Sequence, residues 1–96
     1  MIHMKDGLTV KIVTVNRQIP AIECDSVRLP ISDSANGDFS GSYGIKKGHA
    51  RAVFSLGKGK VIMAENGNTV FTAEISDGFA MVENNEVNVI VDSIEE

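Results

Sequence analysis

A chain of 96 residues, 43% apolar and 23% charged, has the composition of one globular domain. Its formal net charge of −4 argues against a sequence-independent nucleic-acid binder and against a polybasic membrane anchor, because both need a basic face. No apolar run approaches the roughly 20 residues that span a bilayer.

The single cysteine, Cys24, excludes an internal disulfide. We expect it to be a small buried apolar side chain, because a catalytic thiol would need a partner base and only His3 and His49 are available. Residues 1–7 are expected to be disordered or derived from an expression tag, and residues 8–96 to form one domain.

Period-2 alternation predicts a first strand over residues 8–15, with Leu8, Val10 and Ile12 on one side. In residues 21–31 the apolar positions change parity, which predicts a bulge or break near Asp25-Ser26. Pro30 is expected to close that strand or to place it at an edge.

Residues 32–42 are polar, small and contain glycine, so they are predicted to be a loop. A short strand over 49–56 and a turn over 57–60 follow. Two hairpins are then predicted, one turning at Asn66-Gly67 and one at Asn84-Asn85. No segment shows sustained helical periodicity. Eight to ten short strands with tight turns predict an all-β fold, an antiparallel sandwich or a barrel.

Few patterns in the sequence indicate chemistry. The segment 33–38 lacks the distal glutamate of a calcium loop, and the glycines of 57–60 lack the spacing of a phosphate loop. Two histidines and one cysteine are too few for an ordinary zinc site. From the residues alone we therefore predict no catalytic, cofactor-binding or metal-binding residue.

The stretch "GSYGIKKGHARAV", residues 41–53, is the most unusual in composition. His49 is best interpreted as structural, its ring nitrogens tying backbone groups of a neighbouring turn. Gly44 and Gly48 are expected to hold positive-φ or close-packed positions.

Four segments, in order, resemble the ε subunit of F-type ATP synthase, which is called δ in mitochondria. "YGIKKGHA" (43–50) is similar to that family's "fGILPGHA", and "LTVKIVTVNRQI" (8–19) to its opening strand. "CDSVRLP" (24–30) and "ISDGFAMVENNEVNVIVDSIEE" (75–96) resemble later family segments. The resemblance implies the fold of the ε-subunit N-terminal domain, an antiparallel β-sandwich of about ten short strands.

The resemblance also implies a function. It indicates a non-catalytic central-stalk subunit of a proton-translocating ATP synthase, without a cofactor of its own. Such a subunit binds the γ subunit, contacts the c-ring and couples rotation to ATP synthesis. Contact with the membrane is then indirect, through the c-ring, and the expected location is peripheral, at the cytoplasmic face of the bacterial plasma membrane.

By the same resemblance, one face of the sandwich meets γ and one loop faces the c-ring. Ser76, Gly78 and Phe79 match the family's "S-G-G-F" turn. The expected c-ring-facing residues are Ser42, Tyr43, Gly44, Ile45, Lys47, Gly48 and His49.

The sequence also departs from the family pattern. Lys46-Lys47 and Arg51 replace a leucine and two prolines, so the loop is expected to be more mobile and more basic. About seven extra residues lie between Pro30 and Gly44. The resemblance places the family's C-terminal helical hairpin after Glu96, so the hairpin is expected to be absent from residues 1–96, and its inhibitory and ATP-binding roles are not assigned to them.

Two other functions stay open. A diverged sandwich of this fold could act as a protein-binding module outside the synthase, and the lost prolines and the insertion motivate that alternative. A small enzyme of cupin or other barrel type is the third reading, although such enzymes bring several histidines and carboxylates into one pocket.

Overall fold

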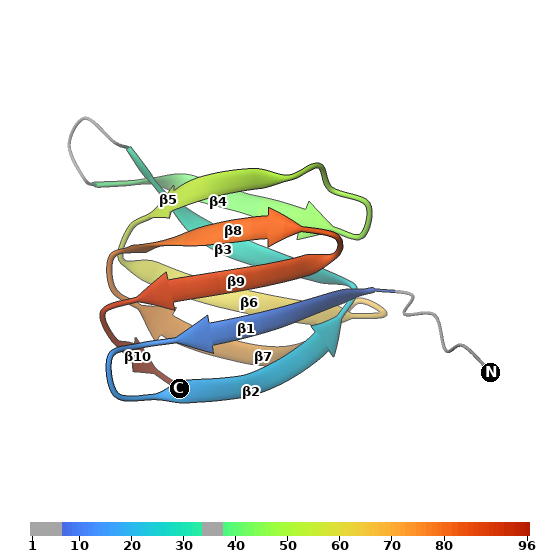
Figure 1. Ribbon diagram of the computed structural model, residues 1–96, viewed down its shortest axis with the longest axis horizontal. Helices are drawn as coiled ribbons and strands as arrows, with labels where there is room; N and C mark the ends of the chain where they lie inside the picture. Colours follow the sequence, from blue (N-terminus) through green and yellow to red (C-terminus); the bar gives the residue numbers. More distant parts are fainter. Residues whose placement is uncertain (1–6, 34–37) are drawn as a thin grey trace.

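The computed structural model describes residues 7–33 and 38–96, which form strands joined by turns (Figure 1). These residues contain no helix, and therefore none that could cross a membrane. The strands are β1 (Leu8–Val13), β2 (Gln18–Cys24), β3 (Ser26–Asp33), β4 (Asp38–Lys46), β5 (Ala52–Leu56), β6 (Gly59–Glu65), β7 (Asn68–Ile75), β8 (Gly78–Glu83), β9 (Glu86–Val91) and β10 (Ile94–Glu95).

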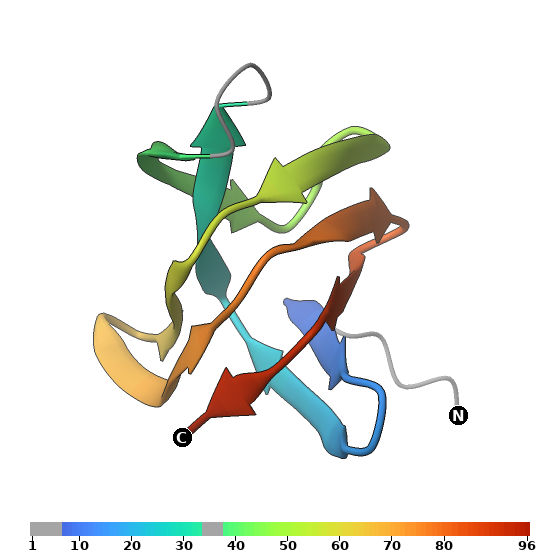
Figure 2. The same cartoon turned by 90° about the vertical axis from the view of Figure 1, so that its left-hand side faces the viewer.

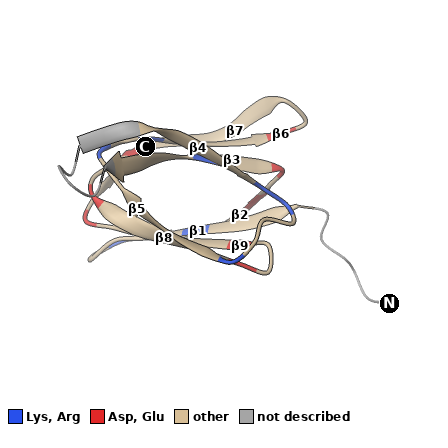
Figure 3. Cartoon of the chain, turned by 90° about the horizontal axis from the view of Figure 1, so that it is seen from above, with Lys and Arg blue, Asp and Glu red and all other residues tan. Residues whose placement is uncertain are grey.

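The strands lie in two facing layers (Figure 3). Backbone pairing follows the order β10-β7-β6-β3-β5-β8-β9-β1-β2, and β4 pairs with the remaining edge of β3. A single residue pair, Ile31 with Leu56, joins β3 to β5 and so links the two layers. The predicted all-β sandwich is confirmed.

One pair of strands departs from the predicted antiparallel arrangement. Strand β1 runs parallel to β9, with Val10 opposite Val87 and Ile12 opposite Val89. The two strands are far apart in sequence, so no hairpin fixes their relative direction. Sequence alternation identifies each strand separately but does not indicate this long-range pairing.

The core lies between the layers and consists mainly of branched aliphatic side chains. The alternation predicted for the first strand is confirmed, since Leu8, Val10 and Ile12 are buried and Val13 points outward. The facing layer contributes side chains such as Val27 and Met63, which are inaccessible to solvent. Each fully buried aliphatic side chain stabilises the fold by roughly 1.5–3 kcal/mol relative to the exposed state.

The predicted break near Asp25-Ser26 is the place where the chain changes layers. Strands β2 and β3 form one long run across the molecule (Figure 2), interrupted only at Asp25. The Asp25 amide donates to the Ala64 carbonyl at 2.9 Å, and the Asp25 carboxylate accepts from the Asn66 amide at 2.7 Å. The crossing is thereby fastened to the β6–β7 hairpin.

The prediction that Pro30 closes its strand or marks an edge was wrong. Strand β3 continues to Asp33, and Pro30 is buried within it. Proline is tolerated there because β3 changes neighbours at this point, from β6 at Arg28 to β5 at Ile31. No residue of β5 or β6 is paired opposite Pro30, and the Pro30 carbonyl accepts from the Gly57 amide at 3.0 Å.

The predicted loop over 32–42 is also wrong in most of its length. Residues 32–33 end β3 and 38–42 begin β4, with Ser32 paired to Phe39; residues 34–37 lie outside the described part. The residues from 38 to 42 show no apolar alternation, but they form a strand because they pair with the backbone of β3. The strand predicted over 49–56 begins later, at Ala52.

Both predicted two-residue hairpin turns are confirmed. Asn66 and Gly67 have φ values of 53° and 81°, and Asn84 and Asn85 have φ values of 52° and 62°. Positive φ at both central residues is the conformation of a type I′ turn, which Asn and Gly adopt at low cost. These turns fix the register of β6 against β7 and of β8 against β9.

Gly78 and Gly44 occupy very different surroundings. A Cβ atom on Gly78 would lie 2.1 Å from the Ile90 carbonyl oxygen and 2.7 Å from the Val91 Cα, both backbone atoms of β9. At Gly44 a Cβ atom would meet nothing within 4 Å, and φ is not positive. The expectation of a special position at Gly44 is therefore not met, whereas Gly78 has no room for a side chain.

We predict that Gly78→Ala lowers the free energy of unfolding by about 1–3 kcal/mol, because the backbone of β9 must move to make room for the added methyl group. The matched variant Gly44→Ala should be neutral or stabilising by roughly 0.5 kcal/mol, since alanine restricts the unfolded chain. Urea denaturation followed by circular dichroism measures both. Equal effects of the two substitutions would contradict the close approach of β8 and β9.

Cys24 is the buried thiol that the sequence predicts, with 1% of its surface exposed. Burial raises the pKa of Cys24, the carboxylates of Asp25 and Glu65 add to this, and a hydrogen bond from the Ser26 backbone opposes it. The thiolate, which is the reactive form, is therefore disfavoured in the folded state.

We predict that a thiol reagent modifies Cys24 at pH 8 only as fast as the folded protein opens, and rapidly when urea unfolds it.

The raised pKa of Cys24 also predicts how stability depends on pH. Since the folded pKa lies above the unfolded value of about 8.5, the contribution of the protonated thiol to stability is complete below pH 8.5. It is lost as the pH rises through the folded pKa. The stability difference between wild type and Cys24→Ala should thus shrink from pH 7 to pH 9.5; a constant difference would contradict the raised pKa.

Candidate functional site in the loop between β4 and β5

The unusual stretch identified in the sequence forms the end of β4 and a tight turn before β5. The His49 amide donates to the Lys46 carbonyl at 3.2 Å, which closes the turn. Gly48 has a φ of 86°, as the third residue of a type II turn requires, so its predicted positive φ is confirmed. Lys47 takes the second position of the turn, where proline is common.

Three aromatic rings gather where β4 and β5 come together. The ring of Tyr43 lies 4.9 Å from that of Phe54 and 5.7 Å from that of His49, and the rings of His49 and Phe54 are 5.9 Å apart. These are favourable separations for tilted and edge-to-face contacts. Tyr43 has the inward parity of Ile45 but remains partly exposed, because it lies at the open margin between the layers.

Both ring nitrogens of His49 have hydrogen-bond partners. Nδ1 lies 2.7 Å from the Ala50 carbonyl oxygen, and Nε2 lies 2.9 Å from the Tyr43 hydroxyl. A carbonyl can only accept, so Nδ1 carries the proton in the neutral ring and Nε2 accepts from the tyrosine. The contact with Ala50 is a tie to backbone, of the kind expected for a structural histidine.

The turn is fastened to a second turn at the same end of the sandwich (Figure 1). The Gly48 amide donates to the Asn85 side-chain carbonyl at 2.8 Å. Arg51 and Glu83 form an ion pair at 3.0 Å, which contributes at most about 1 kcal/mol because both side chains are mostly exposed. Between the two turns lies an open groove of about 410 Å³.

The residues expected to face a partner do not all reach the surface. Ser42, Gly44, Lys47 and Gly48 are exposed, and Tyr43 and His49 belong to the aromatic cluster. Ile45 is fully buried, so it supports the loop from the core and offers no contact surface. Beside them, an Arg28 Nη1 donates to the Ser42 hydroxyl oxygen at 3.1 Å.

The second segment singled out in the sequence, Ser76–Phe79, joins β7 to β8. The Ser93 amide donates to the Ser76 hydroxyl oxygen at 2.8 Å, and the Ser76 amide donates to the Ser93 carbonyl at 3.2 Å. Gly78 then starts β8 against β9, and the side chain of Phe79 is 42% exposed. This segment thus joins a structural turn to an outward-facing aromatic residue.

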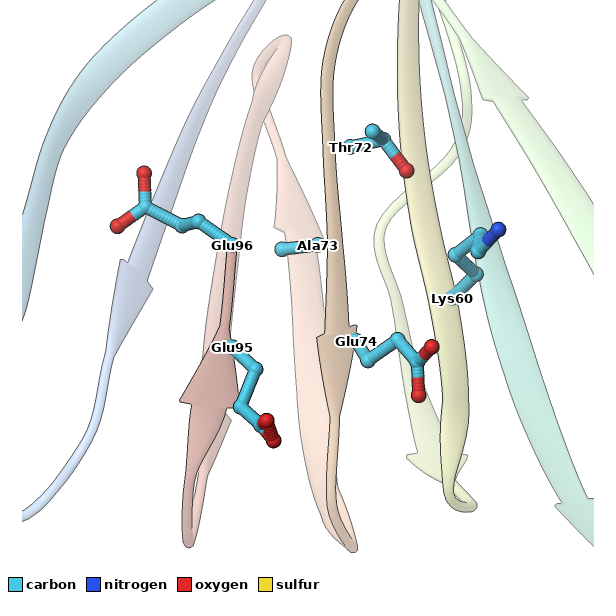
Figure 4. A pocket seen from close by; sticks show the side chains of 6 residues that line it. All are labelled: Lys60, Thr72, Ala73, Glu74, Glu95 and Glu96. Atoms are coloured by element: carbon cyan, nitrogen blue, oxygen red, sulfur yellow. The ribbon is translucent and has the colours of Figure 1, made fainter.

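A hollow of about 280 Å³ lies over β6, β7 and β10. The carboxylates of Glu95 and Glu96 on its margin point in opposite directions (Figure 4), and Glu96 forms an ion pair with Arg17 instead. Within residues 7–33 and 38–96, no three metal-binding side chains gather into a possible site. The hollow therefore has no convergent ligand chemistry.

Sequence reasoning missed two residues that hold the loop from neighbouring elements, Phe54 of β5 and Asn85 of the β8–β9 turn. The sequence pattern predicts Phe54 only as part of a strand and Asn85 only as a turn residue, yet both contact the loop. The contact of Asn85 with Gly48 joins residues 37 positions apart, and the contact of Phe54 with Tyr43 depends on how β4 and β5 lie in space, so alternation within one strand indicates neither. Their position depends on the pairing of β5 with β8.

Comparison with known proteins gives this arrangement a family. Residues 7–96 match the family described as "ATP synthase, Delta/Epsilon chain, beta-sandwich domain". The chain belongs to the ATP synthase delta/epsilon family. The resemblance identified in the sequence is thereby confirmed, and the described strands are the sandwich of a delta/epsilon chain.

Curated relatives of this delta/epsilon domain include two ATP synthase epsilon chains. That of Synechococcus sp. (strain JA-2-3B'a(2-13)) is 34% identical over 88 residues, and that of Gloeothece citriformis (strain PCC 7424) is 33% identical over 88 residues. Each alignment covers 92% of this chain and 58% of the relative. The chain therefore spans little more than half the length of these relatives.

Two solved structures share the fold. One chain is from the Euglena gracilis mitochondrial ATP synthase, OSCP/F1/c-ring, with a TM-score of 0.76 and 17% identity over 96% of this chain and 54% of that chain. The other is from the Tetrahymena thermophila mitochondrial ATP synthase, central stalk/c-ring. It has a TM-score of 0.71 and 13% identity, and the match covers 98% of this chain and 69% of that chain.

We predict that neutral His49 is the tautomer protonated at Nδ1, which a long-range ¹H–¹⁵N NMR spectrum identifies directly. Tyr43→Phe should keep the ring contact with Phe54, remove the donor to Nε2, and cost at most about 1 kcal/mol of stability. Protonation at Nε2 in the wild type would contradict the hydrogen-bond assignment.

Proposed function

We propose that this chain is the sandwich domain of the epsilon subunit of a proton-translocating F-type ATP synthase. In this role it is a non-catalytic part of the central stalk. It binds the γ subunit and contacts the c-ring, so that rotation of the ring is coupled to ATP synthesis.

Membership of the delta/epsilon family over residues 7–96 carries this proposal. The curated relatives are named epsilon chains of ATP synthases, and the structures that share the fold are described as c-ring or central-stalk assemblies. A contact role also fits the described residues, whose titratable side chains gather in no metal site.

The exposed part of the β4–β5 loop is the proposed contact with the c-ring. Ser42, Lys47 and Gly48 present polar and backbone groups at one end of the sandwich, and Tyr43 and His49 support them. A loop held by a closed turn and by the Asn85 side chain is already ordered, so less conformational entropy is lost when a partner binds.

The proposed location follows from these partners. The domain is peripheral to the membrane and is held there by the c-ring, at the cytoplasmic face of the plasma membrane. The epsilon chains of Synechococcus sp. and Gloeothece citriformis among the relatives support a bacterial type of synthase.

Co-expression of this chain with the γ subunit from the same genome tests the proposal. We expect stable co-purification, and we expect the pair to bind detergent-solubilised c-ring. Lys46→Glu with Lys47→Glu should weaken c-ring binding about tenfold or more without affecting γ binding, because it replaces two positive charges on the proposed contact loop with negative ones.

The matched control is Lys58→Glu, which changes an exposed lysine in the turn at the other end of β5. It should leave both interactions unchanged. If the folded wild-type chain binds neither γ nor the c-ring, the synthase role fails. The alternative of a sandwich that binds another protein would then be favoured.

A further inference from the structure

Strand β4 has one backbone edge that no other strand among the described residues covers. It pairs with β3 alone, although it is the longest strand, at 9 residues. The strands at the two ends of the pairing order offer less: β10 has 2 residues, and β2 contains Pro20, which has no N–H to donate. A long uncovered row of N–H and C=O groups is a template for pairing with another chain.

The hydrogen bond of Pro30 shows which backbone groups of β4 point away from β3. Its carbonyl accepts from the Gly57 amide, on the side of β3 opposite to β4. Pro30 and Ser42 are therefore a non-hydrogen-bonded pair, in which both residues direct their N–H and C=O groups away from each other. Because the pattern repeats every second residue, Gly44, opposite Arg28, also directs its N–H and C=O groups outward.

The space beside this part of β4 is open. A Cβ atom added to Gly41 or to Gly44 would meet nothing within 4 Å. Ser42, Tyr43 and Gly44 are all exposed. Glycine inside a strand leaves room for a second backbone to approach closely. The outward backbone groups of β4 are thus accessible to another strand.

The regular part of β4 is short and has a defined centre. A register shift against β3 makes Ser40 an extra residue, and the carbonyl of Lys46 already accepts a hydrogen bond from the closed turn that follows. The regular stretch is therefore Gly41–Ile45, here called the open edge, and its midpoint is Tyr43.

We propose that the open edge pairs with the open edge of a second copy of this chain, antiparallel and with Tyr43 on the two-fold axis. This register places Ser42 of one copy opposite Gly44 of the other. Each such pair exchanges two hydrogen bonds, and the axis repeats the pair. All the outward groups of Ser42 and Gly44 are satisfied in this arrangement.

Two further features favour a second copy as the occupant. Tyr43 is 41% exposed, and the axis brings its ring beside the same ring of the second copy, where an aromatic pair across two strands is stabilising. The first and last residues of β4, Asp38 and Lys46, have opposite formal charges. Antiparallel pairing brings the end of each β4 toward the start of the other, so these charges attract.

This inference does not rest on the proposed function. Ser42 belongs both to the open edge and to the proposed c-ring contact, so the dimer and the c-ring complex exclude each other. The dimer is a state of the chain outside the synthase. Its test uses the chain alone, so its failure leaves the stalk proposal standing, and loss of γ binding leaves the dimer standing.

The test is sedimentation equilibrium of the chain without γ, from about 10 μM to 1 mM, because a single strand pair is a small interface and associates weakly. Gly44→Pro removes one outward N–H without disturbing the ladder to β3. The matched control, Gly44→Ala, keeps that N–H. Circular dichroism and urea denaturation check that both variants are folded.

We expect the wild type to dimerise within this range. Gly44→Pro should raise the dimer Kd about tenfold or more, through the lost hydrogen bond and the bulk of the ring. Gly44→Ala should change the dimer Kd less than about twofold. In the wild type, amide hydrogen exchange at Ser42 and Gly44 should slow as the concentration rises, a measurement that needs no variant.

Three results would overturn the inference. The first is a wild type that stays monomeric to the top of the range with unchanged exchange at Ser42 and Gly44. The second is a dimer that folded Gly44→Pro forms as well as the wild type. The third is a dimer that Met81→Asp dissociates, because Met81 lies on the outer side of the other layer.

Discussion

The fold depends on mutual burial of two strand layers, which must fill the space between them with branched aliphatic side chains. Inward positions of β1, β3, β6 and β9 meet this demand, as Val10, Leu29, Val61 and Val89 show. Once this space is filled, apolar residues on the outer faces cannot add to the core. Phe79 and Met81 of β8 accordingly stay partly exposed on the outer side.

Much of the fold could be predicted from the sequence because the deciding signals are local. Alternation identified β1 and its buried side, and the Asn-Gly and Asn-Asn pairs identified two hairpins by their tolerance of positive φ. The change of parity predicted a break at Asp25, and the structure shows that the chain changes layers there. Each of these signals lies within a few residues of the structure that it specifies.

The parts that escaped prediction depend on distant partners. Pro30 is accepted inside β3 only because β3 changes neighbours there, and β4 is a strand because β3 supplies its hydrogen bonds. The parallel pairing of β1 with β9 has no local signal either. At the candidate site, the family resemblance could not show that strand parity directs Ile45 into the core.

Asn85 links the β4–β5 loop mechanically to the β8–β9 hairpin. Its backbone forms the turn between β8 and β9, while its side chain holds the Gly48 amide of the β4–β5 loop. A force applied to that loop therefore enters the β8–β9 hairpin directly, and the same hairpin bears Phe79, Met81 and Ile90. A load on the loop therefore reaches the β8–β9 hairpin by two routes, through the Asn85 side chain and through β5, which continues the loop and pairs with β8.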